Sequence, residues 1–239
     1  MSDILDINTL FGPYPLANTD LAIDKLIASM QLHKIAQAVT YSTLGILFDP
    51  TVGNAATRAA CGDHAELLAG ATLNPNLYFG NKASLHSLKS NGFKLARLFP
   101  NTQGWKASSS AFHALVHDLG EVALPLMLHI EAAGEVAELA QALGSYSAPV
   151  IFANVGVNQL ADLIAVLKVR PNTYVETSSL TGVGAIKAIA ESVGAERLLF
   201  GSGTPYQPVM SALKVLEFSG LSGEARTQIL GANARRILS

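Results

Sequence analysis

Residues 198–207 read LLFGSGTPYQ, an apolar run that ends in a Gly-Ser-Gly-Thr-Pro turn. Such a run has the length and composition of a strand that is covered on both faces. It belongs to the last of eight strand-like runs: ILDIN (4–8), AQAVTYS (36–42), LLAGATLN (67–74), FKLARLF (93–99), LPLMLHI (124–130), PVIFANV (149–155), NTYVETS (172–178) and RLLFGS (197–202).

Amphipathic stretches that predict helices lie between these runs, for example 18–33 and 157–171, and another covers 222–237. Strands that alternate with helices form a parallel sheet. Eight units in 239 residues correspond to about one unit per 30 residues, the length of a strand–helix unit. We therefore predict an α/β fold, a (β/α)₈ TIM barrel that forms a single domain over residues 1–239. The alternative is an open doubly wound sheet, but no Gly-x-Gly-x-x-Gly follows the first strand.

The composition excludes several classes of partner. Apolar residues make up 49% of the chain and charged residues 14%, which indicates a large core and is compatible with a homo-oligomer. A net charge of −2 gives no basic field for nucleic acid, and no apolar run reaches the roughly 18 residues of a membrane span. The first residues lack the features of a signal peptide, and the single Cys61 cannot form an internal disulfide. We expect a cytoplasmic protein.

In a TIM barrel the functional site lies at the carboxyl ends of the strands. Polar side chains at these ends include Asn8, Arg97, His129, Glu131, Asn154, Glu176, Ser178, Ser202 and Thr204. His129 ends an apolar strand, so its imidazole could act as a base, an acid or a metal ligand, or bond to the barrel wall. His113 and His117 have the spacing of half a zinc site, but they border the apolar stripe of a helix, and we expect no metal there.

Strand alternation directs either Arg97 or Lys94 into the barrel, and the sequence does not decide between them. A buried arginine needs a carboxylate partner, for which Glu176 and Glu131 are the candidates. Its guanidinium could instead bind the carboxylate of a substrate. Glu176 is then either a structural partner or a general base. The turns GSGTP and SSLTG suit an anion nest, which leaves a phosphate-binding barrel as a weaker hypothesis.

Several stretches resemble the amidohydrolase-related (amidohydrolase 2 type) TIM-barrel family, whose barrel is that of the metal-dependent hydrolases. They are ILDINTLFG (4–12), GFKLARLF (92–99), PLMLHI (125–130), VIFANVG (150–156), RLLFGSGTP (197–205) and LSGEARTQILGANARRIL (221–238). The resemblance implies a hydrolase fold, and the branch includes decarboxylases and lactonases that act on small carboxylated rings.

The resemblance also implies a metal centre with a His-x-His on strand one, a His after strands five and six, and an Asp after strand eight. In this sequence those positions are Asn8, Leu10, His129, Asn154 and Gly203. Because zinc needs about four good ligands, we expect a degenerate metal site, no bound metal and no other cofactor. Gly203 also replaces the aspartate that would activate water.

Two functions remain open. The first is a metal-independent hydrolase or lyase for a small carboxylated or ring substrate, with His129 and Glu176 as catalytic groups. In that case Arg97, Asn8, Asn154, Ser202 and Thr204 bind the substrate, and the two asparagines donate to a developing oxyanion. The alternative is a non-catalytic binding or interaction protein built on the same barrel. In either case the expected ligand is small and anionic.

Overall fold

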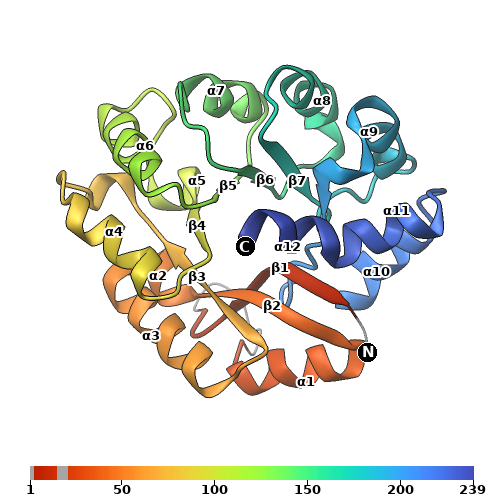
Figure 1. Cartoon of the computed structure of the whole chain (residues 1–239), viewed down its shortest axis with the longest axis horizontal. Coiled ribbons are helices and arrows are strands. Elements are labelled where there is room, and N and C mark those ends of the chain that lie inside the picture. Colours follow the sequence, from red (N-terminus) through yellow and green to blue (C-terminus); the bar gives the residue numbers. More distant parts are fainter. Residues whose placement is uncertain (1–2, 15–20) are drawn as a thin grey trace.

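The computed structural model describes residues 3–14 and 21–239. Eight parallel strands follow one another in sequence order around a barrel, and helices surround them (Figure 1). The strands are β1 (Ile4–Phe11), β2 (Ile35–Ser42), β3 (Leu67–Thr72), β4 (Leu95–Leu98), β5 (Leu126–His129), β6 (Val150–Ala153), β7 (Thr173–Glu176) and β8 (Leu198–Leu199). The predicted (β/α)₈ barrel is confirmed, and the open sheet is wrong.

The outer ring consists of α1 (Ile23–His33), α3 (Pro50–Asp63), α4 (Lys82–Ser90), α6 (Ser110–Val122), α7 (Glu135–Ala142), α8 (Leu160–Val169), α9 (Ala185–Val193) and α10 (Val209–Glu217). Shorter turns are α2 (Thr43–Leu47), η1 (Pro75–Leu77), α5 (Pro100–Gln103), η2 (Val157–Gln159) and η3 (Ala195–Arg197). The predicted helix over 18–33 begins at Ile23, and its first predicted residues lie partly outside the described ranges. Among the described residues, no helix is long and apolar enough to cross a membrane.

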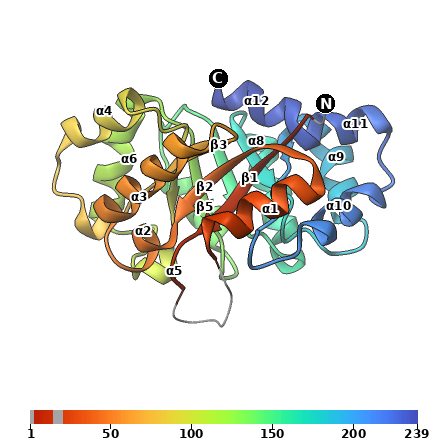
Figure 2. The same ribbon diagram turned by 90° about the horizontal axis from the view of Figure 1, so that it is seen from below.

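The last helical segment closes the amino end of the barrel. It runs through α11 (Gly223–Thr227), the π-helical turn η4 (Gln228–Ala232) and α12 (Asn233–Leu238), close to the predicted 222–237. Apolar side chains of α12 pack against the apolar side chains inside the barrel. In Figure 1 α12 lies at the centre of the ring, and in Figure 2 it lies at the end opposite α2 and α5. The carboxyl ends of the strands therefore form the open face.

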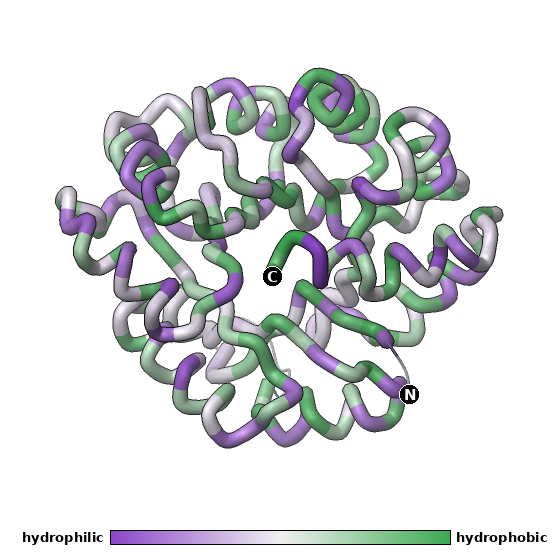
Figure 3. The backbone as a smooth tube through the Cα atoms, in the orientation of Figure 1, coloured by the Kyte–Doolittle hydropathy of each residue, from purple (hydrophilic) through white to green (hydrophobic). Residues whose placement is uncertain are grey.

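A second, larger apolar core lies between the strands and the outer helices, and hydrophilic segments are spread over the outside of the ring (Figure 3). Within the outer layer, Cys61 is half-buried on α3 and packs against the apolar core. Burial raises the pKa of its thiol to about 11, so it is a poor nucleophile at neutral pH.

The barrel closes where β1 meets β8, and this seam is irregular. Ile7 N donates to Phe200 O at 3.0 Å, and Gly203 N donates to Asn8 O at 3.0 Å. β8 is only two residues long because other groups accept the next N–H groups of the chain. Ile229 O accepts from Phe200 N, and the Asp6 carboxylate accepts from Ser202 N. The predicted strand over 197–202 is shortened for this reason.

Helices α2 and α3 cross so closely that only glycine fits at the contact. A Cβ on Gly53 would lie 2.1 Å from the backbone nitrogen of Gly45. Gly62 lies on the same helix α3, and a Cβ there would meet no atom within 4 Å. Substitution of Gly53 therefore tests the close packing of the two helices, and substitution of Gly62 tests helix propensity alone.

We predict that Gly53→Ala lowers the free energy of unfolding by about 1–3 kcal/mol or more, because backbone atoms cannot yield as a flexible side chain can. Gly62→Ala should leave stability unchanged or raise it by up to about 1 kcal/mol through helix propensity. Urea unfolding followed by circular dichroism measures both. Equal effects of the two substitutions would contradict the close helix contact.

Candidate functional site

A cavity of about 250 Å³ opens at the carboxyl ends of the strands. Its lining combines polar and apolar residues. Polar groups come from Asn8, Arg97, His129, Glu131, Asn154 and Ser178, and apolar ones from Leu10, Ile46, Leu47 and Phe99, with Tyr14 and Tyr206 also among the lining residues. Of the predicted site residues, Glu176, Ser202 and Thr204 are buried and do not line the cavity.

Arg97, and not Lys94, enters the barrel. Lys94 is exposed, whereas Arg97 is 1% exposed at the cavity floor. One guanidinium nitrogen (Nη1) donates to Asn8 Oδ1 at 2.7 Å, and the other (Nη2) lies 3.2 Å from His129 Nδ1. The guanidinium also lies over the ring of Phe99, 4.6 Å from its centre.

The positive charge of Arg97 has no close counterion. Within the described ranges, no carboxylate oxygen lies within 4.0 Å of the guanidinium, and its Nε has no hydrogen-bond partner. The expected ion pair with Glu176 or Glu131 is therefore not formed. Burial lowers the pKa of Arg97, yet a guanidinium stays protonated. A buried cation at a cavity, with the charge of Glu176 acting on it only from beyond ion-pair distance, favours an anionic ligand.

Glu176 is instead held by the loops that follow β6 and β7. Its oxygens accept from Asn154 N, Ser178 N and the Ser178 hydroxyl, each at 2.8 Å. Glycine at 201 makes room for the carboxylate, since a Cβ there would lie 2.2 Å from Glu176 Oε2. These contacts favour a positioning role. Action as a general base stays a prediction, and it would require loss of these bonds.

The side-chain amides of Asn154 and Asn8 form different hydrogen bonds within the protein. The Asn154 side chain donates to Ile130 O and accepts from the Ser179 hydroxyl, so it ties two loops together. Asn8 Oδ1 is occupied by Arg97, and its Nδ2 donates to Ser178 Oγ at 3.3 Å. A hydrogen-bonded chain thus runs from Arg97 through Asn8 and Ser178 to Glu176. The predicted oxyanion donors are largely engaged within the protein.

Contacts with Arg97 determine the tautomer of His129. A guanidinium can only donate, so the Nδ1 that faces it accepts, and the ring proton is on Nε2. Burial, and then the charge of Arg97, lowers the His129 pKa to about 3. Nε2 lies 3.7 Å from Glu131 Oε1, a carboxylate that lines the cavity. At neutral pH His129 is therefore a neutral hydrogen-bond donor, and not the base that the sequence left open.

Asp6 is a residue that the sequence reasoning missed. Its carboxylate is completely buried and accepts from Asn8 N at 3.1 Å and from Ser202 N at 3.0 Å. It joins β1 to the turn after β8 and thereby positions Asn8. Desolvation raises the Asp6 pKa to about 7, and among the described residues its Oδ2 has no hydrogen-bond partner. A lone acidic residue within the apolar strand 4–8 was the available signal.

The GSGTP turn does not form the expected anion nest. Ser202 N and Gly203 N donate to Asp6 and to Asn8 O, and Thr204 N donates to Ser202 Oγ at 3.0 Å. The Thr204 hydroxyl donates to Gln207 O. Three successive N–H groups are thus used inside the protein, which removes the donors that a phosphate would need.

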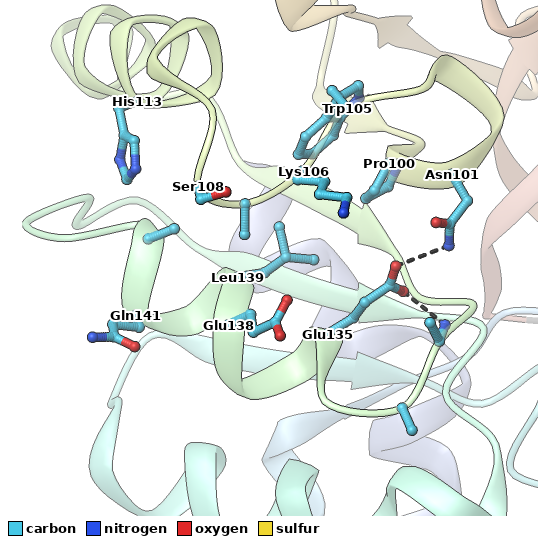
Figure 4. A pocket seen from close by; sticks show the side chains of 14 residues that line it. Pro100, Asn101, Trp105, Lys106, Ser108, His113, Glu135, Glu138, Leu139 and Gln141 are labelled. Atoms are coloured by element: carbon cyan, nitrogen blue, oxygen red, sulfur yellow. Dashed lines mark hydrogen bonds between the residues drawn. The ribbon is translucent and has the colours of Figure 1, made fainter.

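Two other features lie outside the barrel. A cavity of about 750 Å³ lies between α7 and the segment before α6, and in Figure 4 its Glu135 is bonded to Asn101. Among the described residues, the one cluster with metal-ligand geometry is His117, Asp118 and Glu121 on α6. Lys82 Nζ lies 3.1 Å from Asp118 and 2.7 Å from Glu121, so a lysine supplies the cation there. His113 is not part of this cluster.

The family model for an amidohydrolase matches residues 27–239. The chain belongs to the amidohydrolase family. A comparison with curated proteins finds no match. The family-model match confirms the predicted family. The fold of this amidohydrolase-family chain is also similar to that of several solved structures.

Three solved relatives illustrate the likeness. A 2,6-dihydroxybenzoate decarboxylase in complex with 2,6-dihydroxybenzoate is 13% identical, with a TM-score of 0.79 over 100% of this chain and 99% of the other. A probable 2-pyrone-4,6-dicarboxylic acid hydrolase from Acinetobacter baumannii, with citric acid bound, is 16% identical, with a TM-score of 0.76 over 99% of both chains. A 5-carboxyvanillate decarboxylase from Novosphingobium aromaticivorans, with manganese and a nitrobenzoic acid, is 15% identical, with a TM-score of 0.79 over 99% and 96%.

The raised pKa of Asp6 predicts that this family member loses stability as the pH rises. Between about pH 4 and pH 7 the folded protein keeps a proton that the unfolded chain releases, so the free energy of unfolding falls by up to about 1.4 kcal/mol per pH unit. Asp6→Asn should remove this component and keep an oxygen that accepts from Asn8 N and Ser202 N.

Urea unfolding of the wild type and of Asp6→Asn at pH 5, 6, 7 and 8 measures this difference. Asp3→Asn, at the exposed residue just before β1, is the matched control and should keep the wild-type slope. A slope that persists unchanged in Asp6→Asn would show that Asp6 is not its source and would contradict the raised pKa.

For His129 we predict a neutral imidazole with its proton on Nε2 from pH 5 to pH 8, because its pKa is about 3. Nitrogen-15 NMR of the imidazole rings reports both tautomer and charge. The His129 signal is assigned by its loss in His129→Gln. A signal that titrates near pH 6.5 would refute the assigned contact with Arg97.

Proposed function

We propose that this barrel binds a small carboxylate at Arg97 and acts on it as a hydrolase or lyase without the metal ion that some relatives hold. The observation that carries the proposal is the buried guanidinium of Arg97, which lines a 250 Å³ cavity and has no carboxylate within 4.0 Å among the described residues. A ligand carboxylate would supply the missing negative charge and could accept from a guanidinium N–H.

The solved relatives support a carboxylate as the ligand. One binds 2,6-dihydroxybenzoate, another holds citric acid and a third holds a nitrobenzoic acid. Each of these molecules carries at least one carboxylate. The apolar walls of the present cavity, formed by residues such as Leu10, Ile46 and Phe99, suit the ring of a small carboxylated compound.

The donor set does not fit a manganese ion of the kind that some relatives hold. Of the five positions that the resemblance connects with a metal, Leu10 and Gly203 offer no side-chain donor. The Asn8 and Asn154 oxygens accept from Arg97 and Ser179. The remaining ligand, His129 Nδ1, faces the guanidinium at 3.2 Å. A second cation placed there would meet the positive charge of Arg97 in a buried environment.

The side chains around the cavity have distinct capabilities in such a reaction. Arg97 holds the carboxylate, and the Nε2–H of His129 can donate to an oxygen on which negative charge develops. Glu131 is the lining carboxylate nearest to His129, with about a third of its side chain exposed. Its place beside His129 makes it the candidate for moving a proton. Asn8 and Glu176 hold Arg97 and the loops in position.

A non-catalytic binding protein is the second candidate. It is favoured by the full engagement of Glu176 and of the turn at 202–204 in internal hydrogen bonds. Both candidates share the carboxylate site and differ in turnover. Incubation with a panel of carboxylated rings, followed by chromatography of the products, separates them.

The test of the carboxylate site compares Arg97→Met with Lys94→Met. Arg97→Met removes the buried charge but leaves Asn8 Oδ1 and His129 Nδ1 without their donor, so a thermal melt verifies that the variant folds. It should weaken benzoate binding about 100-fold, the result of losing a buried charge pair. Lys94→Met removes an exposed cation from the same strand region and should bind as the wild type does.

Isothermal titration calorimetry with benzoate, on protein treated with a chelator, measures these affinities. Binding that survives the chelator and is lost in Arg97→Met supports the proposal. If the chelated wild type binds no small carboxylate and binding returns with manganese, the metal-independent site is refuted.

A further inference from the structure

Two tyrosines lie together at the cavity. Tyr14 is the third residue after β1, and Tyr206 lies in the loop between β8 and α10. Their rings meet edge to face, with centres 4.8 Å apart and an angle of 83° between the planes. Both rings line the cavity that contains Arg97. The pair therefore bridges the loops on the two sides of the barrel seam.

The two tyrosine rings pack directly against each other. Burial, and then a hydrogen bond with Tyr14, raises the pKa of Tyr206 above its usual range. The Tyr206 hydroxyl therefore stays protonated at ordinary pH. Edge-to-face geometry is the favourable arrangement for such rings. Tyr206 nevertheless remains 40% exposed, so part of its ring is free to contact a ligand.

Phe99 forms a wall on another side of the cavity. It follows β4, which stands four places from β8 in the order of eight strands, so the two loops face each other across the barrel. The Phe99 ring lies 4.6 Å from the guanidinium of Arg97 and 5.2 Å from the ring of His129. A carboxylate bound at Arg97 consequently directs the rest of its molecule between Phe99 and the tyrosines.

We propose that the Tyr14–Tyr206 pair determines specificity in this cavity by selecting carboxylates that carry a flat ring over short aliphatic ones. This inference rests on the proposed function, because it needs the carboxylate at Arg97. An aliphatic carboxylate such as propionate can satisfy the guanidinium but offers the tyrosine rings little apolar area. A ring adds apolar area that the tyrosine faces and Phe99 cover.

The experiment compares benzoate and propionate, two ligands that share a carboxylate and differ in the ring. Calorimetry gives the dissociation constants for the wild type, Tyr206→Leu, Tyr14→Leu and Tyr206→Phe. Phe218→Leu, which removes an exposed ring next to α10 and away from the cavity, is the matched control. Thermal melts verify that each variant folds, and Tyr14→Leu provides a second test if Tyr206→Leu does not.

Tyr206→Leu and Tyr14→Leu should each weaken the binding of benzoate about 10-fold. They should change the dissociation constant of propionate less than about 2-fold. Tyr206→Phe should stay within about 3-fold of the wild type for both ligands, because it keeps the ring and loses only the hydroxyl. Phe218→Leu should change neither. This pattern supports the inference. If the tyrosine pair only held the two loops together, its loss would change the dissociation constants of both ligands by similar factors.

Equal weakening of the two ligands, or no weakening, in the leucine variants overturns the inference and leaves the carboxylate site intact. If the wild type binds neither benzoate nor propionate, the proposed function fails and the inference fails with it. The two failures are therefore distinguishable in a single set of titrations.

Discussion

The charge of Arg97 is almost fully buried where it lines the cavity, and the surrounding architecture follows from that constraint. Phe99 covers one face of the guanidinium, while Asn8 and His129 contact two of its nitrogens. None of these neighbours carries a negative charge at neutral pH. The protein therefore holds the cation with dipoles and aromatic faces, which leaves its net charge available to whatever enters the cavity.

Two buried carboxylates fix the backbone segments around Arg97. Asp6 and Glu176 use their oxygens on backbone N–H groups at the ends of the strands, and each connects one strand end with a neighbouring loop. Asp6 holds the backbone of Asn8, which in turn holds Arg97. The position of the guanidinium is thus set by acceptors that do not touch it. This explains why the interior of the barrel contains charged residues without a direct ion pair to Arg97.

The barrel itself was predictable because eight apolar runs alternate with amphipathic ones, and each run is a local signal. The arrival of Asn8, Arg97 and His129 at one face was predictable because parallel strands end on the same side. The hydrogen-bond partners of these side chains were not predictable. Whether Arg97 meets Glu176 or Asn8 depends on packing between distant segments, 89 residues apart for Asn8, which no local pattern contains. The tyrosine pair was missed for the same reason, since its members belong to the first and last loops of the barrel.

The pairing of β1 with β8 can form only late in the synthesis of the chain. The hydrogen bond from Ser202 N to Asp6 joins residues 196 positions apart, so a ribosome that has finished β1 must make almost the whole barrel before this strand finds its second neighbour. Until then the edge of β1 that faces β8 remains unpaired, and the Asp6 carboxylate lacks the bond from Ser202 N. Contacts of such long sequence separation form slowly. The nascent chain should therefore depend on chaperone protection for longer than a protein whose neighbouring strands are all adjacent in sequence.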